Sequence, residues 1–132
     1  MPGCVLRVSG DQFHPGDYLA GSALAPCNVF VKGERRGRDS FWDSSGFTVV
    51  VSDASGNDLR RQIFDAVEFL RVHRKELVGL ATCVGVEDVR LDFGIARKNG
   101  FLQSSELPVE LITIAGELRI GIEISIYGED ES

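Results

Sequence analysis

The hydrophobic residues of the chain follow a helical period most clearly between residues 57 and 78. Apolar side chains in this stretch fall on one side when successive residues turn by about 100°. We expect Ser55 or Asn57 to cap the helix N-terminus and Gly79 to end the helix, with His73 half-buried at its edge. A stripe of this length needs a partner surface. Its members are Leu59, Ile63, Ala66, Val67, Leu70 and Leu77.

Strands are predicted by a different period. Three segments, 4–9, 88–96 and 119–127, alternate apolar and polar residues with the period of two that is typical of a strand with one buried face. Two more segments, 28–32 and 47–52, are rich in β-branched and aromatic residues and are also expected to form strands.

Turn and capping signals predict the remaining elements. The Asn99-Gly100 pair favours a tight turn that closes a hairpin onto a short strand at 101–103. A short helix is expected between residues 11 and 24, and another is expected to start near Pro108. For that last helix, the expected cap is Ser104 or Ser105, and the expected inward residues are Leu111, Ile112, Ala115 and Leu118.

This order of elements predicts an α+β fold built as a two-layer sandwich. Through residue 96 it matches a ferredoxin-like β-α-β-β-α-β core, to which the last helix and strand are appended. Strict alternation leaves one face of a sheet to solvent, so we expect a mostly antiparallel sheet with the helices on one face. The whole chain, 1–132, is expected to form a single domain with a frayed acidic tail at 129–132.

Composition and charge narrow the classes of partner. A net charge of −6 argues against general binding to nucleic acids or anionic membranes, and it favours a basic partner. No apolar run reaches the roughly 20 residues of a membrane span, so a cytoplasmic protein is expected. Cys4, Cys27 and Cys83 are too few and too far apart for a disulfide framework or a zinc knuckle, so buried free thiols are expected and no cofactor is indicated.

Short motifs along the chain resemble a known family. Lys32-Gly33-Glu34 is followed by the lone Trp42, the long helix, and Pro108-Val109-Glu110-Leu111 running into the segment 123–128. Together they resemble the small bacterial family catalogued as domain of unknown function 4279. The resemblance implies a compact bacterial α+β protein with no assigned reaction, and therefore no functional residues to transfer. The Arg35-Arg36-Gly37-Arg38 run departs from the family pattern.

The segment after the second predicted strand is a candidate anion site. Its basic side chains stand beside two glycines, whose backbone amides could help to hold a phosphate or carboxylate. Trp42 could stack on a nucleic-acid base, or it could anchor the loop to the core. A solvated loop explains the same residues without any ligand. The basic residues are Lys32, Arg35, Arg36 and Arg38.

A second candidate lies around a Pro-Gly break, where Asp11, His14 and Asp17 fall within seven residues. A carboxylate could orient the imidazole there for acid–base chemistry. No obvious nucleophile lies nearby in the sequence, however, and a metal site built from His14 and His73 would rest on two distant histidines. No metal site is therefore predicted.

The solvent-facing side of the sheet is the third candidate. A solvated face with cross-strand charge pairs explains its residues adequately, and the alternative is a recognition or homodimer surface. The residues predicted on it are Arg7, Thr48, Arg90, Asp92, Glu123 and Ser125, with Tyr127 at the rim.

Two functional hypotheses follow from these features. The first is a non-catalytic protein-interaction module, such as an immunity-type antidote whose acidic surface meets a basic toxin. The second is a small enzyme or ligand-binding domain for an anionic substrate, which would use the basic loop 32–38 together with Asp11, His14 and Asp17.

Overall fold

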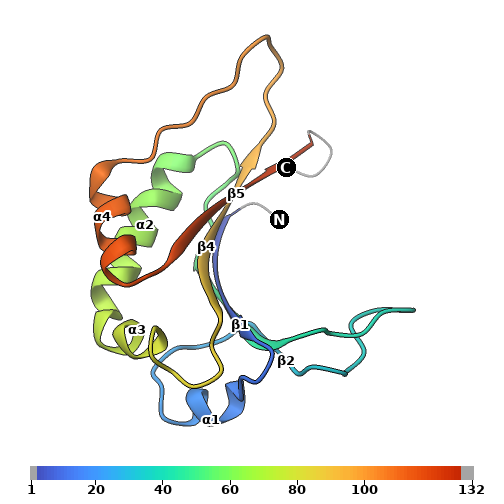
Figure 1. The fold of residues 1–132 in the computed structure, drawn as a ribbon. Coiled ribbons are helices and arrows are strands. Elements are labelled where there is room, and N and C mark those ends of the chain that lie inside the picture. Colours follow the sequence, from blue (N-terminus) through green and yellow to red (C-terminus); the bar gives the residue numbers. More distant parts are fainter. Residues whose placement is uncertain (1–2, 129–132) are drawn as a thin grey trace.

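A computed structural model describes residues 3–128, and the predicted tail at 129–132 lies outside this range. In the described residues the chain forms one five-stranded sheet and four helices, so the predicted α+β class is confirmed (Figure 1). The elements are β1 (Gly3–Gly10), α1 (Pro15–Ala20), β2 (Asn28–Phe30), β3 (Ser45–Ser52), α2 (Leu59–Val72), α3 (Arg74–Leu80), β4 (Asp88–Ala96), α4 (Val109–Glu117) and β5 (Gly121–Tyr127).

The strands lie in the order β2-β3-β1-β4-β5. Every neighbouring pair is antiparallel except β4 and β5, which are parallel, so the prediction of a mostly antiparallel sheet is confirmed. The order differs from that of a four-stranded ferredoxin-like sheet, because β5 extends the edge beyond β4. Helices α2, α3 and α4 lie on one face of the sheet (Figure 1).

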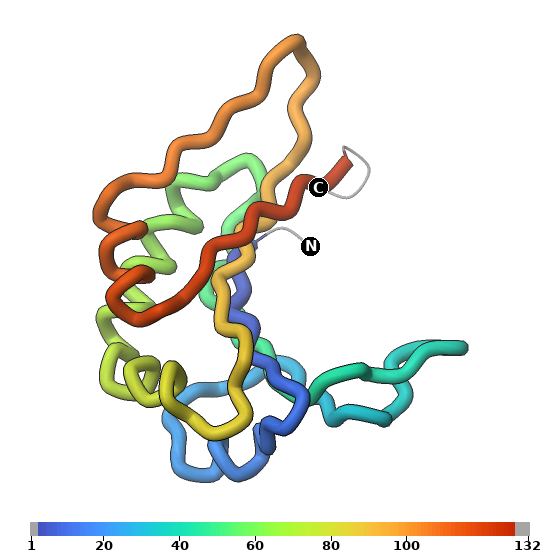
Figure 2. Tube along the Cα trace, viewed as in Figure 1, coloured from blue at the N-terminus to red at the C-terminus, as the bar shows by residue number. Residues whose placement is uncertain are grey.

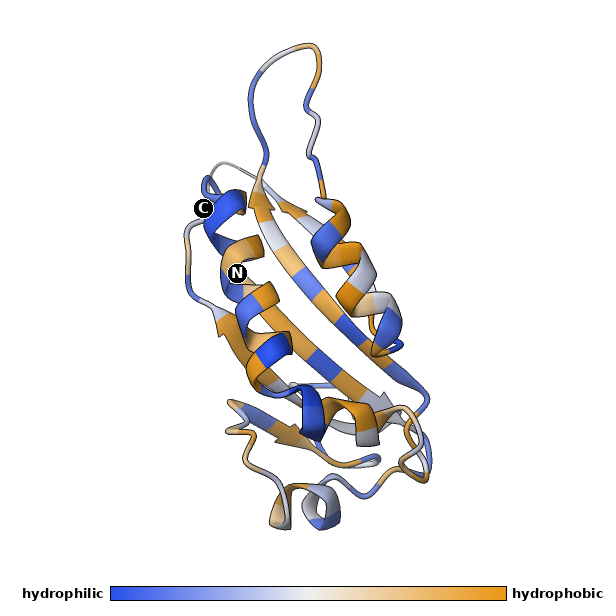
Figure 3. Cartoon of the chain, turned by 90° about the vertical axis from the view of Figure 1, so that its left-hand side faces the viewer, coloured by the Kyte–Doolittle hydropathy of each residue, from blue (hydrophilic) through white to orange (hydrophobic). Residues whose placement is uncertain are grey.

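The core forms between this covered face and α2. The pleat of β1 directs Leu6 and Val8 inward, where both are fully buried, and the paired residues Leu91 and Phe47 point the same way. The predicted stripe of α2 packs on them (Figure 3). Five of its six residues are buried and Leu59 is half-buried against the core, so the predicted face is confirmed.

The helical segment predicted at 57–78 is two helices. α2 ends where His73 leaves the helical conformation, with φ −102°, and α3 then begins at Arg74. Gly79, predicted to end the helix, lies inside α3. The predicted half-burial of His73 is confirmed, with its ring 4.5 Å from that of Phe69.

The predicted caps of α2 were also wrong. Asp58 is the N-cap, and its carboxylate accepts a hydrogen bond from the Arg61 amide at 3.1 Å. The hydroxyl of Ser55 instead accepts from the Asn57 amide in the preceding turn. Gln62 is fully buried, and its amide donates to the carbonyls of Ser55 (3.1 Å) and Gly94 (2.8 Å). A polar side chain thus ties the start of α2 to the end of β4.

The chain between β4 and α4 contradicts the predicted hairpin. Residues 101–103 form no strand, and the loop 97–108 extends beyond the sheet (Figure 2). Its base is closed by Gln103, whose amide donates to the Ala96 carbonyl and accepts from the Lys98 amide, both at 3.0 Å. A side-chain contact across the base of the loop therefore takes the place of the predicted hairpin pairing.

α4 begins later than its serines suggested. Pro108 is the N-cap without a side-chain hydrogen bond, so neither Ser104 nor Ser105 caps the helix. Ile112, predicted to face inward, is 51% exposed, and Ile114 is buried in its place. The other three predicted inward residues are buried.

The cysteines differ in their exposure. Cys4 is buried, Cys83 is half-buried and Cys27 is exposed, so the prediction of buried thiols fails for Cys27. Burial, with a smaller contribution from the nearby charge of Asp92, raises the pKa of the Cys4 thiol far above its usual range. Cys4 therefore stays protonated at neutral pH.

Leu70→Ala tests the packing of α2. Leu70 is fully buried, and its truncation is expected to lower the free energy of unfolding by about 2–5 kcal/mol, because it leaves a cavity under the helix. Urea denaturation measures the change. Val72→Ala, on the exposed side of the same helix, is the control and should change it by less than about 0.5 kcal/mol. An unchanged midpoint for Leu70→Ala would mean that the stripe does not face the sheet.

Candidate functional site

The side of the sheet opposite α2 carries most of the residues predicted there, and we call it the open face. The register places Arg7 of β1 opposite Thr48 of β3 and Arg90 of β4. Asp92 of β4 lies opposite Glu123 of β5. Since paired residues point to the same side of a sheet, five residues predicted from alternation come together across three strands. They are Arg7, Arg90, Asp92, Glu123 and Ser125.

Asp92 is the centre of one charged cluster. Only 6% of Asp92 is exposed, and its two carboxylate oxygens are bound separately. The Arg7 guanidinium lies 3.2 Å from one oxygen, and the Ser125 hydroxyl donates to the other at 2.6 Å. The cluster joins β1, β4 and β5, so it holds the open face in one arrangement.

Arg90 forms a second, more exposed cluster. Its guanidinium lies 3.0 Å from the Asp88 carboxylate and 3.3 Å from that of Glu123. Solvent screens such exposed pairs, and each is worth at most about 1 kcal/mol. Thr48 is different, because it is buried and lies with its hydroxyl 3.2 Å from the Cys27 sulfur. The prediction that Thr48 and Asp92 meet solvent was therefore wrong, because both side chains are buried. Tyr127 is half-buried at the rim.

Residues 31–44 form a projecting hairpin, which we call the arm. The Gly33 amide donates to the Trp42 carbonyl at 2.8 Å, and the Trp42 amide donates to the Glu34 carbonyl at 2.9 Å. A β-bridge pairs Arg35 with Phe41 further along. The arm leaves the sheet on the side away from α2, the side of the open face (Figures 1 and 2).

Trp42 anchors the arm to the sheet. Its ring stacks on that of Phe30, with 4.1 Å between centroids and 17° between planes, and Phe30 is itself buried. Of the two roles expected for Trp42, the structure therefore shows the anchoring of the loop to the core. Trp42 also forms a cation–π contact, because the Arg36 guanidinium lies over its ring, 4.7 Å from the centroid.

The arginines of the arm do not gather around one point. Arg35 lies over Phe41 at 5.6 Å and donates to the Arg38 carbonyl at 2.6 Å, whereas Arg36 lies over Trp42. Because Phe41 and Trp42 are consecutive in an extended hairpin, they point to opposite sides. The arm therefore displays two separate arginine–aromatic pairs, and these residues do not form a single cradle for an anion.

The segment with Asp11, His14 and Asp17 lines a hollow of about 410 Å³, together with Val29 and Val31. Lys32 is the basic residue that reaches it, through an ion pair with Asp11. Hydrogen bonding to Lys32 and to Gln12 lowers the pKa of Asp11, so its carboxylate is ionised at neutral pH. Arg35, Arg36 and Arg38 do not line the hollow.

The predicted acid–base pair is not formed. Among residues 3–128, the His14 ring has no hydrogen bond to Asp11 or Asp17. His73 lies at the end of α2, against Phe69. Nor does the described part of the chain bring together three His, Cys, Asp or Glu side chains that could hold a metal ion.

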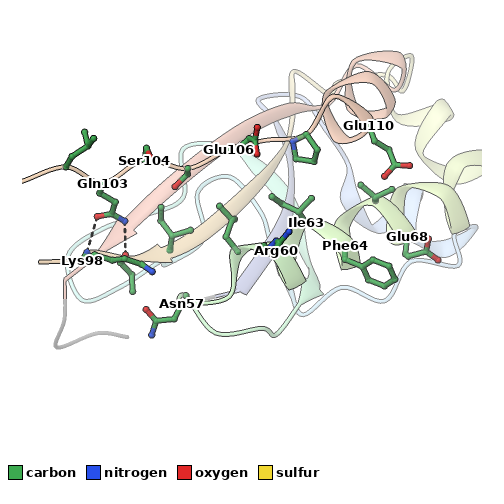
Figure 4. A pocket seen from close by; sticks show the side chains of 18 of the residues that line it. Asn57, Arg60, Ile63, Phe64, Glu68, Lys98, Gln103, Ser104, Glu106 and Glu110 are labelled. Carbon is green, nitrogen blue, oxygen red and sulfur yellow. Dashed lines mark hydrogen bonds between the residues drawn. The ribbon is translucent and has the colours of Figure 1, made fainter. Parts of the chain in front are cut away.

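One hollow was not predicted. A groove of about 830 Å³ runs along α2, between this helix and the loop 97–108 (Figure 4). It was missed because 101–103 was predicted as a strand. The exposed Phe64, on the flank of the predicted stripe, was the available signal, since a large exposed apolar residue beside a stripe can widen it into a second contact surface.

Comparison of the chain with protein families, with curated proteins and with solved structures gave no match. The resemblance to domain of unknown function 4279 therefore stays a prediction. None of the helices among residues 3–128 has the length and apolar character needed to cross a bilayer.

Asp92→Ala tests the open-face cluster. Loss of this carboxylate is expected to lower the free energy of unfolding by about 1–2 kcal/mol, because two charge-assisted hydrogen bonds disappear. Urea denaturation measures it, with Glu123→Ala as the exposed control, expected to change by less than about 0.5 kcal/mol. Equal effects of the two substitutions would show that Asp92 has no special structural role.

Proposed function

We propose that this chain is a non-catalytic protein-interaction module that binds its partner through the open face and the arm. The observation that carries the proposal is that the open face and the arm lie on the same side of the sheet. The helices cover one face, and the arm projects from the other (Figure 1). A partner seated on the open face would therefore meet the arm as well. Two elements contacting one partner can supply the area that a stable interface needs.

The residue types of the arm support this proposal. Arginine and aromatic residues dominate the energetics of protein interfaces, and the arm presents Arg35 with Phe41 and Arg36 with Trp42. Phe41 is exposed. Backbone hydrogen bonds and ring contacts already hold these side chains in place, so less conformational entropy is lost on binding.

Charge indicates the kind of partner. The net charge of −6 attracts a protein that is basic overall, as an immunity-type antidote would attract a basic toxin. Half of that charge comes from Glu129, Asp130 and Glu131. The open face itself carries paired charges of both signs, which favours a partner with matching pairs. A second copy of the chain is the alternative occupant of the same face.

The finer assignments belong to the same proposal. The order β1-α1-β2-β3-α2-β4 supports a ferredoxin-like core with α4 and β5 appended. Membership of the family of domain of unknown function 4279, and with it a bacterial cytoplasmic protein, is supported by the residue motifs alone.

The alternative of a small enzyme or ligand-binding domain for an anionic substrate has weaker support. It needs the basic loop and the segment with Asp11, His14 and Asp17 to meet around one ligand. Lys32 alone joins them, and its charge is already paired with Asp11. The hollow there offers a site for a small molecule but no assembled catalytic group.

The test is capture of a partner from extracts of the source cell, followed by calorimetry with the purified partner. The triple variant Arg35→Ala, Arg36→Ala, Phe41→Ala is expected to weaken binding at least about tenfold, because the few residues that dominate an interface are enriched in arginines and aromatics, and losing one of them costs about 2 kcal/mol or more. Higher salt is expected to slow association.

The matched control is Arg74→Ala, Lys75→Ala, Val78→Ala, which removes two cations and one exposed apolar residue from α3 on the covered side. It is expected to leave the affinity unchanged. Equal losses in both triple variants would contradict the use of the arm. A chain that retains no protein at either low or high salt would contradict the module itself, and a dimer in light scattering that the arm variant disrupts would identify a second copy as the occupant.

A further inference from the structure

The groove between α2 and the loop 97–108 lies beside α2 (Figure 4). This helix is on the covered side of the sheet, and the arm projects from the other side (Figure 1). The wall of the groove along α2 is apolar and continues the core stripe outward through Phe64. The end of β4 and the loop complete it. The apolar residues that line it are Leu59, Ile63, Phe64, Val67, Ile95 and Leu102.

The groove is already formed in the chain. Gln103 fixes the base of the loop by bonding both the Ala96 carbonyl and the Lys98 amide (Figure 4). Gln62 fixes the start of α2 against Gly94. Its volume of about 830 Å³ falls within the roughly 300–1,000 Å³ that is usual for small-molecule sites.

The two ends of the groove differ in charge. At the end nearest the start of α2, Arg60 and Lys98 line the groove, and neither has an ion pair among residues 3–128. At the far end, Arg71 is neutralised by ion pairs with Glu68 and Glu110. Figure 4 shows Lys98 and Glu68 at opposite ends.

We propose that this groove binds a small amphipathic carboxylate, with its hydrocarbon body on the apolar wall and its carboxylate between Arg60 and Lys98. Apolar contact supplies affinity and the two cations fix the orientation, which is the usual division of roles in a ligand site. Ser104 and Ser105 line the groove as further hydroxyl donors. The proposal is independent of the protein-interaction role, since it uses other residues on the other side of the sheet.

The negative charge of Glu106, which lines the groove, disfavours a bound carboxylate and provides a second test of the proposal. Glu106 has no ion pair among the described residues. Its charge repels a bound carboxylate, so neutralising it should strengthen binding of an anion and weaken binding of a cation.

The experiment is titration calorimetry of the full chain with dodecanoate, compared with dodecanol and dodecyltrimethylammonium. Dodecanoate is expected to bind one per chain and at least about tenfold more tightly than either analogue. Octanoate, four carbons shorter, should bind at least about tenfold more weakly than dodecanoate. The variant Arg60→Gln/Lys98→Gln should lose at least about tenfold in dodecanoate affinity, and Glu106→Gln should gain.

Arg74→Gln/Lys75→Gln, on α3, is the matched control and should leave dodecanoate affinity unchanged. Melting temperatures of all variants confirm that each is folded. No binding of dodecanoate, or equal binding of dodecanol, would overturn the proposal. A dimer of the chain would also overturn it, if Phe101→Ser dissociates that dimer and dodecanoate does not. Light scattering measures both effects. The occupant of the groove would then be the exposed loop tip of a second copy, which carries Phe101.

Discussion

The packing of α2 on one face of the sheet is the interaction on which the rest of the structure depends. It buries Leu70 against the inward residues of β1, of which Leu6 and Val8 are fully buried. Because side chains alternate along a strand, fixing Leu6 inside fixes Arg7 outside. The same constraint acts on β4 and β5, so the composition of the open face is a consequence of how the core is packed.

This division gives the chain two surfaces with different chemistry. The open face is held in register by Asp92, which binds Arg7 and Ser125 across strands, and the arm extends its reach with arginine–aromatic pairs. The helical side has the groove, where α2 presents Phe64 beside the stripe that it buries. One side of α2 thus packs on the core, and the adjacent side of the same helix forms a wall of the groove. A macromolecular contact and a small-molecule site can therefore coexist without sharing residues.

The parts of the fold that were predictable are those governed by local periodicity. The alternation of apolar and polar residues predicted the bounds of β4. It also predicted that Arg7, Asp92 and Ser125 lie on one face of the sheet, as the strand register confirms. What failed depended on side-chain contacts that the period of apolar residues does not reveal. Gln62 is buried because its amide reaches the Gly94 carbonyl, 32 positions along the chain. Gln103 closes the loop by bonding the Ala96 carbonyl, where the Asn99-Gly100 pair predicted a hairpin. The groove was missed because the loop that forms one of its walls was predicted as a hairpin. Anchoring by Trp42 was among the expected roles of that residue, whereas its partner Phe30, twelve positions away, was not identified.

α2 covers one face of the sheet and leaves the opposite face open for a partner. Neighbouring valines of β3 test this arrangement most directly, because Val49 points to the covered face and is 5% exposed, whereas Val50 points to the open face and is 52% exposed. The measurement is the relaxation of valine methyl resonances by a soluble paramagnetic agent in the isolated chain. Strong broadening of the Val50 methyl resonances is expected, with little broadening of those of Val49. Equal protection of both valines would contradict this arrangement, because the open face would then be covered.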